Sequence, residues 1–365
     1  MKKFILAAIF FWMLTASTNI FAQQLDEQLD NYNFEDVNAL INGQQDYKFD
    51  FGVLIRKIIS GDFDFANLFE FAQATFFSEF KNNMCQAKGL IILIILSALI
   101  KNLADSFQIQ SVSEIAFYIS YIVISINLFS TFKISIGIAQ DLLQTILQLL
   151  QISLPLVISL LTMSGNFYAS NIFNPIIFFF ADAIVLIINF MLPLVTMFVS
   201  IQIINNMTGK NLMTNFALLI KTIVSWSLKI ISLSFMGVLT LQRISAPLLE
   251  GATAKTAKLI INVVPVVGEV FTGAVDSVIS WAHLIKNAAM VVLVIGIFFV
   301  CMASVIKLGI FALVYKILSA LVQPISDERI IKCTQVIFDS SVLLLSCCFT
   351  AIVVFLFALM IFTSL

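Results

Sequence analysis

The sequence has little charge and almost no histidine. Charged residues make up 11% of its 365 residues, whereas soluble globular domains average about 25%. The net charge at pH 7 is −1, which excludes a generally basic nucleic-acid-binding protein. His283 is the sole histidine, so the chain cannot build a metal site from several histidines.

Recognisable catalytic motifs are also missing. None of the five cysteines belongs to a CxxC pair, which argues against a zinc site or a disulfide framework and favours buried, inert thiols. Gly209–Lys210 is followed by Asn211 and lacks the upstream glycine of a GxxxxGK(S/T) nucleotide loop. The motifs GxSxG and HExxH do not occur either. We therefore predict a protein that is not an enzyme and that binds no cofactor.

Long apolar runs dominate what is present. Hydrophobic residues make up 60% of the chain, and several runs reach the roughly 20 residues that a helix needs to cross a bilayer. Because backbone groups in lipid must satisfy each other, helices are the expected element. We predict an all-α, polytopic integral membrane helical bundle with about seven spanning helices. The predicted spans are 88–104, 114–138, 144–163, 173–204, 217–241, 288–315 and 340–363.

The N-terminal part differs from the rest. Lys2 and Lys3 precede an apolar run, which predicts a signal peptide over residues 1–22; an uncleaved anchor is the alternative. Between residues 23 and 88, eleven acidic residues face five basic ones. Because positive charge retains loops in the cytoplasm, we predict that residues 23–87 form a translocated acidic segment with amphipathic, Phe-rich helices. Residues 88–365 then form the multi-pass membrane domain.

Residues 252–287 stand out from the apolar runs around them. Pro265 and Gly268 divide the region into two short pieces. Short, interrupted pieces of this kind often mark binding or translocation sites in transporters. We predict a broken amphipathic or re-entrant helical pair, and a spanning pair or an interfacial helix remains open.

The second piece carries its polar residues on one helical face. They recur at steps of three and four, and apolar residues fill the remaining positions. We predict that this stripe meets water or partner helices, and that two lysines before it lie at the membrane surface. A satisfied interior histidine is the alternative for the single imidazole. The candidate residues are Lys255, Lys258, Glu269, Thr272, Asp276, Ser280, His283 and Asn287.

Two further polar features lie within predicted spans. Glutamines recur at helical steps, and they either line an aqueous path or join helices through amide hydrogen bonds; they are Gln140, Gln144, Gln148 and Gln151. Asp182 lies within an apolar run, where a carboxylate is expected to be paired, protonated or facing a wet cavity. Lys133, Lys229 and Lys307 are its candidate partners, and the sequence does not choose among them.

Several short strings, in their order along the chain, resemble the stage III sporulation protein AE family. The resemblance covers about residue 90 to the end, after a signal peptide and a variable segment. The strings are Leu154–Pro155, Thr162–Gly165, Asn174–Pro175, Gly251–Lys258, Val264–Gly268, Asp276, Leu284–Ala288 and Pro324–Arg329. Glu328 departs from the Lys expected in many relatives.

The resemblance implies a role in endospore formation, in the mother-cell membrane that surrounds the forespore. It implies membership of a secretion-like channel complex whose other parts are a separate cytoplasmic ATPase, a ring-forming AG protein and an AH protein. It implies no catalytic residues. The expected function is therefore a non-enzymatic subunit of that channel. A stand-alone small-molecule permease and a structural membrane anchor of the complex are the alternatives.

Overall fold

A computed structural model describes residues 53, 57, 66–106, 110–163, 174–208, 212–261 and 267–364. The chain divides into two compact units, residues 1–63 and 64–365, and the helices discussed below belong to the second unit. The predicted signal peptide and nearly all of the acidic segment up to residue 65 lie outside the described residues.

The second unit is built from long helices. They are α4 (Ala66–Ser106), α5 (Gln110–Met163), α6 (Asn174–Thr208), α7 (Thr214–Ile261), α8 (Val267–Val322) and α9 (Glu328–Ser364). Within the described ranges, these six helices each contain a stretch long and apolar enough to cross a membrane. The prediction of an all-α membrane bundle is confirmed.

The described part contains six candidate spans rather than about seven, because two predicted spans form one helix. Residues 114–138 and 144–163 both lie in α5. The predicted boundary rested on the polar step at Gln140 and Asp141, and polarity interrupts an apolar run without breaking a helix. At a rise of about 1.5 Å per residue, the 54-residue α5 is about 80 Å long, well beyond the roughly 30 Å of bilayer hydrocarbon.

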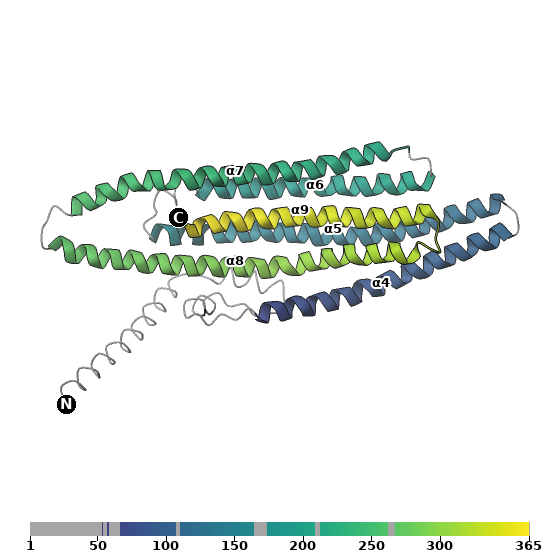
Figure 1. Cartoon of the computed structure of the whole chain (residues 1–365), viewed down its shortest axis with the longest axis horizontal. Helices are drawn as coiled ribbons and strands as arrows, with labels where there is room; N and C mark the ends of the chain where they lie inside the picture. Colours follow the sequence, from purple (N-terminus) through teal and green to yellow (C-terminus); the bar gives the residue numbers. More distant parts are fainter. Residues whose placement is uncertain are drawn as a thin grey trace, which may run out of the picture. The chain divides into compact units, whose positions relative to one another are not determined.

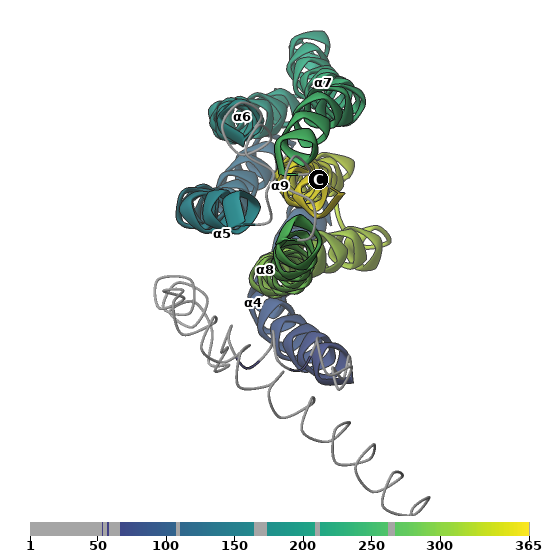
Figure 2. The same cartoon turned by 90° about the vertical axis from the view of Figure 1, so that its left-hand side faces the viewer.

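Helix α9 occupies the middle of the bundle. It packs against α5, α6, α7 and α8, while α4 packs on α5 and α8 (Figures 1 and 2). Accordingly, Cys347, Ala351 and Phe355 of α9 are fully buried. Successive helices alternate in direction, so the start of α4 and the C-terminal end of α9 lie at one end of the bundle (Figure 1). The segment 323–327 that joins α8 to α9 lies at the other end, which we call the α8–α9 loop end.

The Phe-rich segment and the first predicted span form one continuous helix, α4, which runs across position 88. Phe80, Met84 and Ala87 pack against Ile310 and Val314 of α8. One ion pair reinforces this contact, since Lys307 Nζ of α8 lies 3.7 Å from Glu79 Oε1. The Phe-rich segment therefore uses part of its apolar surface to contact α8.

The region 252–287 does not form two separate short pieces. Residues up to Ile261 continue α7, and residues from Val267 continue into the apolar part of α8. Helix α7 packs on α6 and α9, whereas α8 packs on α4, α5 and α9. Only the connection 262–266, with Pro265, lies between them and outside the described residues. Gly273 is the one helix-weakening residue from Glu269 to Asn287, and a single glycine costs a helix only about 1 kcal/mol.

Candidate functional site

The predicted polar stripe lies on the N-terminal part of α8. Glu269, Thr272, Asp276, Ser280 and His283 belong to its first turns, and Asn287 is exposed where the candidate span begins. Lys255 and Lys258 lie in the last turns of α7. Except for Asn287, the side chains of these residues lie outside the described ones, so the stripe stays a prediction.

The glutamine row lies on the outer face of α5. Gln144, Gln148 and Gln151 are exposed, as is Gln140 one turn earlier. Their amides therefore do not join helices within the chain. They face the surroundings of the bundle, and the two alternatives left open by the sequence become a water-lined surface or a contact with another molecule.

Asp182 is half-buried near the start of α6, and none of its candidate partners pairs with it. Lys307 pairs with Glu79. Lys229 lies over the ring of Trp226, with 5.9 Å between Nζ and the ring centroid. Among the described residues Asp182 has no ion pair, so a wet or partner-facing environment is the reading that remains for this carboxylate.

The α8–α9 loop end carries a polar cluster that the sequence did not predict. Lys101 Nζ, in the last turns of α4, lies 2.6 Å from Asp327 Oδ2. Asp327 Oδ1 accepts a hydrogen bond of 3.0 Å from the Arg329 backbone N–H, which is the geometry of an N-cap on α9. The Phe117 ring of α5 lies under both cations, 5.8 Å from Lys101 Nζ and 4.8 Å from Arg329 Cζ. Three helices are thereby tied to the loop.

Asp327 is held in its ionised form. Partial burial opposes ionisation, but the hydrogen bonds from Lys101 and from the Arg329 N–H, with the positive charges of both residues, outweigh it. The pKa of the Asp327 carboxyl therefore lies below its ordinary value of 3.8. Ser97, Asn102 and Ser326 join Lys101 and Asp327 around a cavity of about 190 Å³, so the loop end presents a small polar pocket.

A buried contact lies directly beneath this cluster. The Tyr121 hydroxyl of α5 donates to the Ile203 carbonyl of α6 at 2.6 Å, and Cys333 Sγ of α9 lies 2.7 Å from the same oxygen. Tyr121 and Cys333 are almost completely buried. Because a buried polar group without a partner is costly, this contact favours one arrangement of the three helices.

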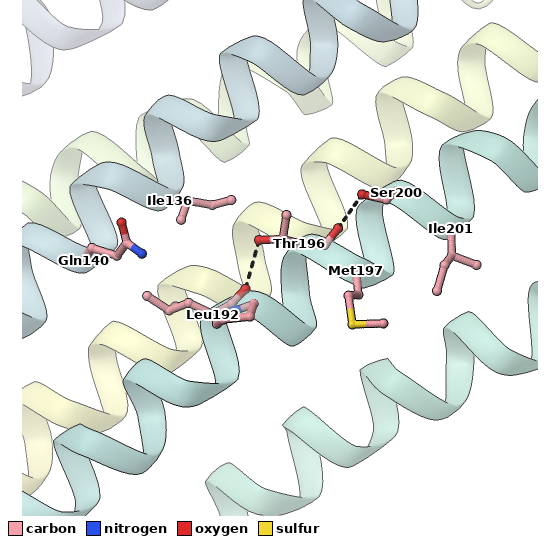
Figure 3. Close-up of a pocket in the computed structure, with 8 residues that line it drawn as sticks. Ile136, Gln140, Leu192, Thr196, Met197, Ser200 and Ile201 are labelled. Carbon is pink, nitrogen blue, oxygen red and sulfur yellow. Dashed lines mark hydrogen bonds between the residues drawn. The ribbon is translucent and has the colours of Figure 1, made fainter.

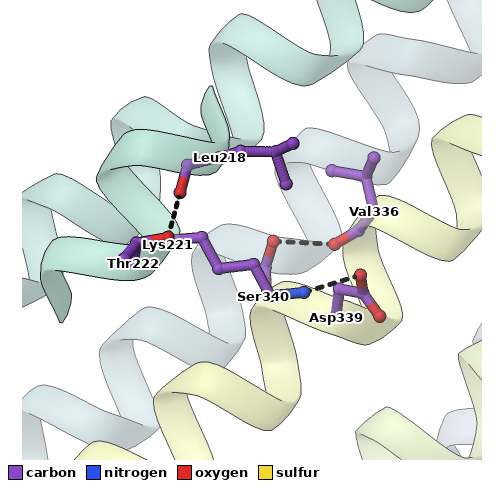
Figure 4. A network of polar contacts seen from close by, with 6 residues as sticks. All are labelled: Leu218, Lys221, Thr222, Val336, Asp339 and Ser340. Atoms are coloured by element: carbon purple, nitrogen blue, oxygen red, sulfur yellow. Dashed lines mark hydrogen bonds and ion pairs between the residues drawn. The ribbon is translucent and has the colours of Figure 1, made fainter. Parts of the chain in front are cut away.

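An ion pair links α7 to the central helix. Lys221 Nζ lies 3.1 Å from Asp339 Oδ2, as Figure 4 shows. Both residues lie inside candidate spans, yet the neighbouring hydroxyls of Thr222 and Ser340 bond to carbonyls of their own helices. The two charges therefore neutralise each other within an otherwise apolar contact.

Two lateral grooves open between helices. One, of about 440 Å³, lies between α5 and α6 and is bordered by Gln140, Pro193 and Thr196 (Figure 3). The other, of about 660 Å³, lies between α7 and α9 and is bordered by Lys229, Ser232 and Thr350. The Thr196, Ser232 and Thr350 hydroxyls donate to carbonyls one turn back in their own helices. In the part of the chain that the structure describes, no group of three or more His, Cys, Asp or Glu side chains could hold a metal.

Sequence reasoning missed the loop-end cluster because its members lie far apart in the chain. A signal was present, since Pro324–Arg329 was among the strings that carried the family resemblance. What the strings could not show is that Lys101 and Phe117 complete the arrangement. That knowledge requires the packing of α4 and α5 against the loop.

Comparisons with known proteins agree on one family. The model of the stage III sporulation protein AE family matches residues 49–365. A stage III sporulation protein AE from Bacillus subtilis (strain 168) is 32% identical over 294 residues, which cover 78% of this chain and 73% of that protein. No solved structure matches. The match runs through α4 to α9 and includes the loop-end cluster and the predicted stripe, and the chain belongs to the stage III sporulation protein AE family.

Proposed function

We propose that this chain is a non-enzymatic membrane subunit of a multiprotein, secretion-like channel that links mother cell and forespore during endospore formation. Family membership is the observation that carries the proposal. The six candidate spans suit a membrane subunit, and the exposed amides of α5 suit a protein that works in an assembly. Its partners would be a separate cytoplasmic ATPase and the ring-forming AG and AH proteins.

The stripe on α8 is the proposed contact with the conduit or with a neighbouring subunit. We expect Glu269→Leu and Asp276→Leu to block sporulation after engulfment, because each removes a charge that the stripe would present to water or to a polar partner. Spore yield and membrane insertion are measured together. Val275→Leu, an apolar exchange on the same helix, is the matched control and should sporulate normally. Full spore yield from both charge variants would remove the stripe from the mechanism.

Two assays separate the channel subunit from its alternatives. Vesicles that contain only this protein should show no flux of small molecules, whereas a stand-alone permease would conduct or exchange them. For a structural anchor, stripe variants would lose co-purification of the other subunits. For a conduit, these variants would retain the subunits and lose passage of material.

We further propose that the protein lies in the mother-cell membrane around the forespore with its N-terminal segment translocated. The bundle then has a defined sidedness, because an even number of spans returns the C-terminal end of α9 to the side on which α4 begins. The α8–α9 loop end carries Lys101, Lys316, Arg329 and Lys332 near its helix ends. This is the charge expected of a cytoplasmic face.

Single cysteines in a Cys85→Ser background test this topology, because Cys85 is the exposed native thiol among the five. A membrane-impermeant maleimide added from outside should label Asp30→Cys and Ser364→Cys, and should label Glu328→Cys only after permeabilisation. Labelling of Glu328→Cys from the same side as Asp30→Cys would contradict the proposed sidedness.

A further inference from the structure

The outer face of α5 changes character halfway along the helix. From Ile115 to Ile126 its exposed side chains are mainly apolar, including Ile119 and Ile122, as expected of a surface that meets lipid. From Asn127 onward a seam of exposed residues follows, almost all polar or small. The α5 seam consists of Asn127, Ser130, Ile134, Gly137, Asp141, Gln144, Gln148 and Gln151, of which Gly137 is half-buried and the others are exposed.

The inner face of this segment is apolar, so the usual arrangement for a soluble helix is reversed. Leu128, Phe132, Leu143 and Ile146 are fully buried against the bundle. Helix α6 shows what surrounds the bundle at this level. Because α5 and α6 are antiparallel and Gln140 lies beside Thr196, the seam glutamines stand level with the α6 segment whose exposed side chains include Leu186 and Phe190.

Lipid tails are a poor match for the seam. Exposed Leu186 and Phe190 are 64% and 73% accessible and suit hydrocarbon, whereas amide and carboxylate groups at the same depth would lose their hydrogen bonds to water. Another polar surface must therefore cover the α5 seam. The seam itself indicates the kind of surface.

The spacing of the seam is that of a helix pair. Its members follow alternating steps of three and four residues from Asn127 to Gln151, which is the repeat that keeps one seam against a parallel neighbour in a left-handed helix pair. Gly137 has nothing within 4 Å of the position of an added Cβ. It leaves room for the close backbone approach that small residues allow between membrane helices.

The chemistry of the seam is self-complementary. Each glutamine amide both donates and accepts, so a row of glutamines can satisfy an identical row. Pro155 lies inside α5 and has no N–H, so the Gln151 carbonyl lacks its intrahelical donor and remains open to an amide from outside. Gln140 and Gln144 flank Asp141 and can donate to its carboxylate across the seam.

We propose that the α5 seam is a self-association surface, at which α5 of a second copy of this chain packs in parallel and in register. Two copies inserted in one membrane share their orientation, so equal residues meet at equal depth. The resulting contact is isologous and closes as a dimer with a two-fold axis along the membrane normal. This association would hold whether or not the chain takes part in a channel.

Disulfide crosslinking of the full-length protein tests the proposal in membranes of a host that makes no spores. In a Cys85→Ser background, Gln144→Cys, Gln148→Cys and Gln151→Cys are compared with Leu186→Cys, an exposed position on α6. Because a disulfide needs Cβ atoms about 4 Å apart, we expect about tenfold more crosslinked dimer at the seam than at Leu186. Equal crosslinking at all positions, or none at the seam, would overturn the proposal.

A second measurement guards against variants that insert poorly. The oligomeric state of the protein in nanodiscs is measured for the wild type, for the triple exchange of Gln144, Gln148 and Gln151 to Leu, and for Ile122→Leu as control. We expect the triple variant to associate on the order of tenfold more weakly, because apolar side chains in lipid lose the interhelical hydrogen bonds. An unchanged oligomer would contradict the seam. So would seam cysteines that a water-soluble maleimide labels freely, or that crosslink to a different protein in sporulating cells.

Discussion

Exchanging Asp327 for alanine is expected to destabilise the bundle by about 2–3 kcal/mol. The substitution removes the N-cap of α9 and the ion-pair partner of Lys101 at once. It also leaves Lys101 and Arg329 together over Phe117 without a counter-charge. The thermal unfolding midpoint of the protein in detergent, measured at neutral pH, should fall accordingly.

Two variants separate the contributions to this effect. Asp327→Asn keeps a side chain that caps helices well but loses the charge, so it should be less damaging than alanine. Glu328→Ala tests the adjacent position, where the carboxylate is exposed and pairs only with Lys332 one turn away. A pair of that kind contributes about 0.3–0.5 kcal/mol. Equal losses at 327 and 328 would show that the loop-end cluster does not stabilise the fold.

The pH dependence of the same comparison has a definite sign. The pKa of Asp327 is lowered in the folded protein, so its charge contributes fully above the unfolded value of about 4. That contribution is lost as the pH falls through the folded value. The stability difference between the wild type and Asp327→Asn should therefore be constant near neutral pH and shrink under strongly acidic conditions.

The amino-acid sequence was sufficient for the class of fold but not for the limits of its helices. Apolar runs identified membrane helices because hydropathy reports directly on lipid contact. The runs could not show that α5 continues through Gln140 and Asp141, or that α4 continues from its Phe-rich segment into the first span. Helix continuity depends on backbone hydrogen bonding, which polar side chains do not interrupt.

Functional residues were predictable only where they share one helix. The glutamine row was visible because its spacing is local, although its exposure was not. The contacts of Lys101 with Asp327 and of Lys221 with Asp339 join residues 226 and 118 positions apart. Periodicity carries no information about such pairs. For the same reason Lys307 pairs with Glu79, a residue that the search for partners of Asp182 did not consider.

The pair of Lys221 and Asp339 offers the sharpest test of this packing. We expect Asp339→Leu and Lys221→Leu each to lower stability by about 2–3 kcal/mol, because either change leaves a single charge inside an apolar helix contact. The double exchange to leucine should recover most of the loss, since no charge then remains to be desolvated. Unfolding of the four proteins in detergent gives the coupling free energy.

The partner in this cycle must be Lys221 and no other lysine. Lys229 lies two turns further along α7 and contacts Trp226 instead, so Lys229→Leu combined with Asp339→Leu should show no recovery. If Lys221→Leu fails to rescue Asp339→Leu, the ion pair does not join α7 to α9. The packing of α7 would then rest on its apolar contacts with α6 and α9 alone. Recovery that is specific to Lys221 would instead fix the register of α7 against the central helix, because only this pairing brings Nζ within 3.1 Å of Asp339 Oδ2.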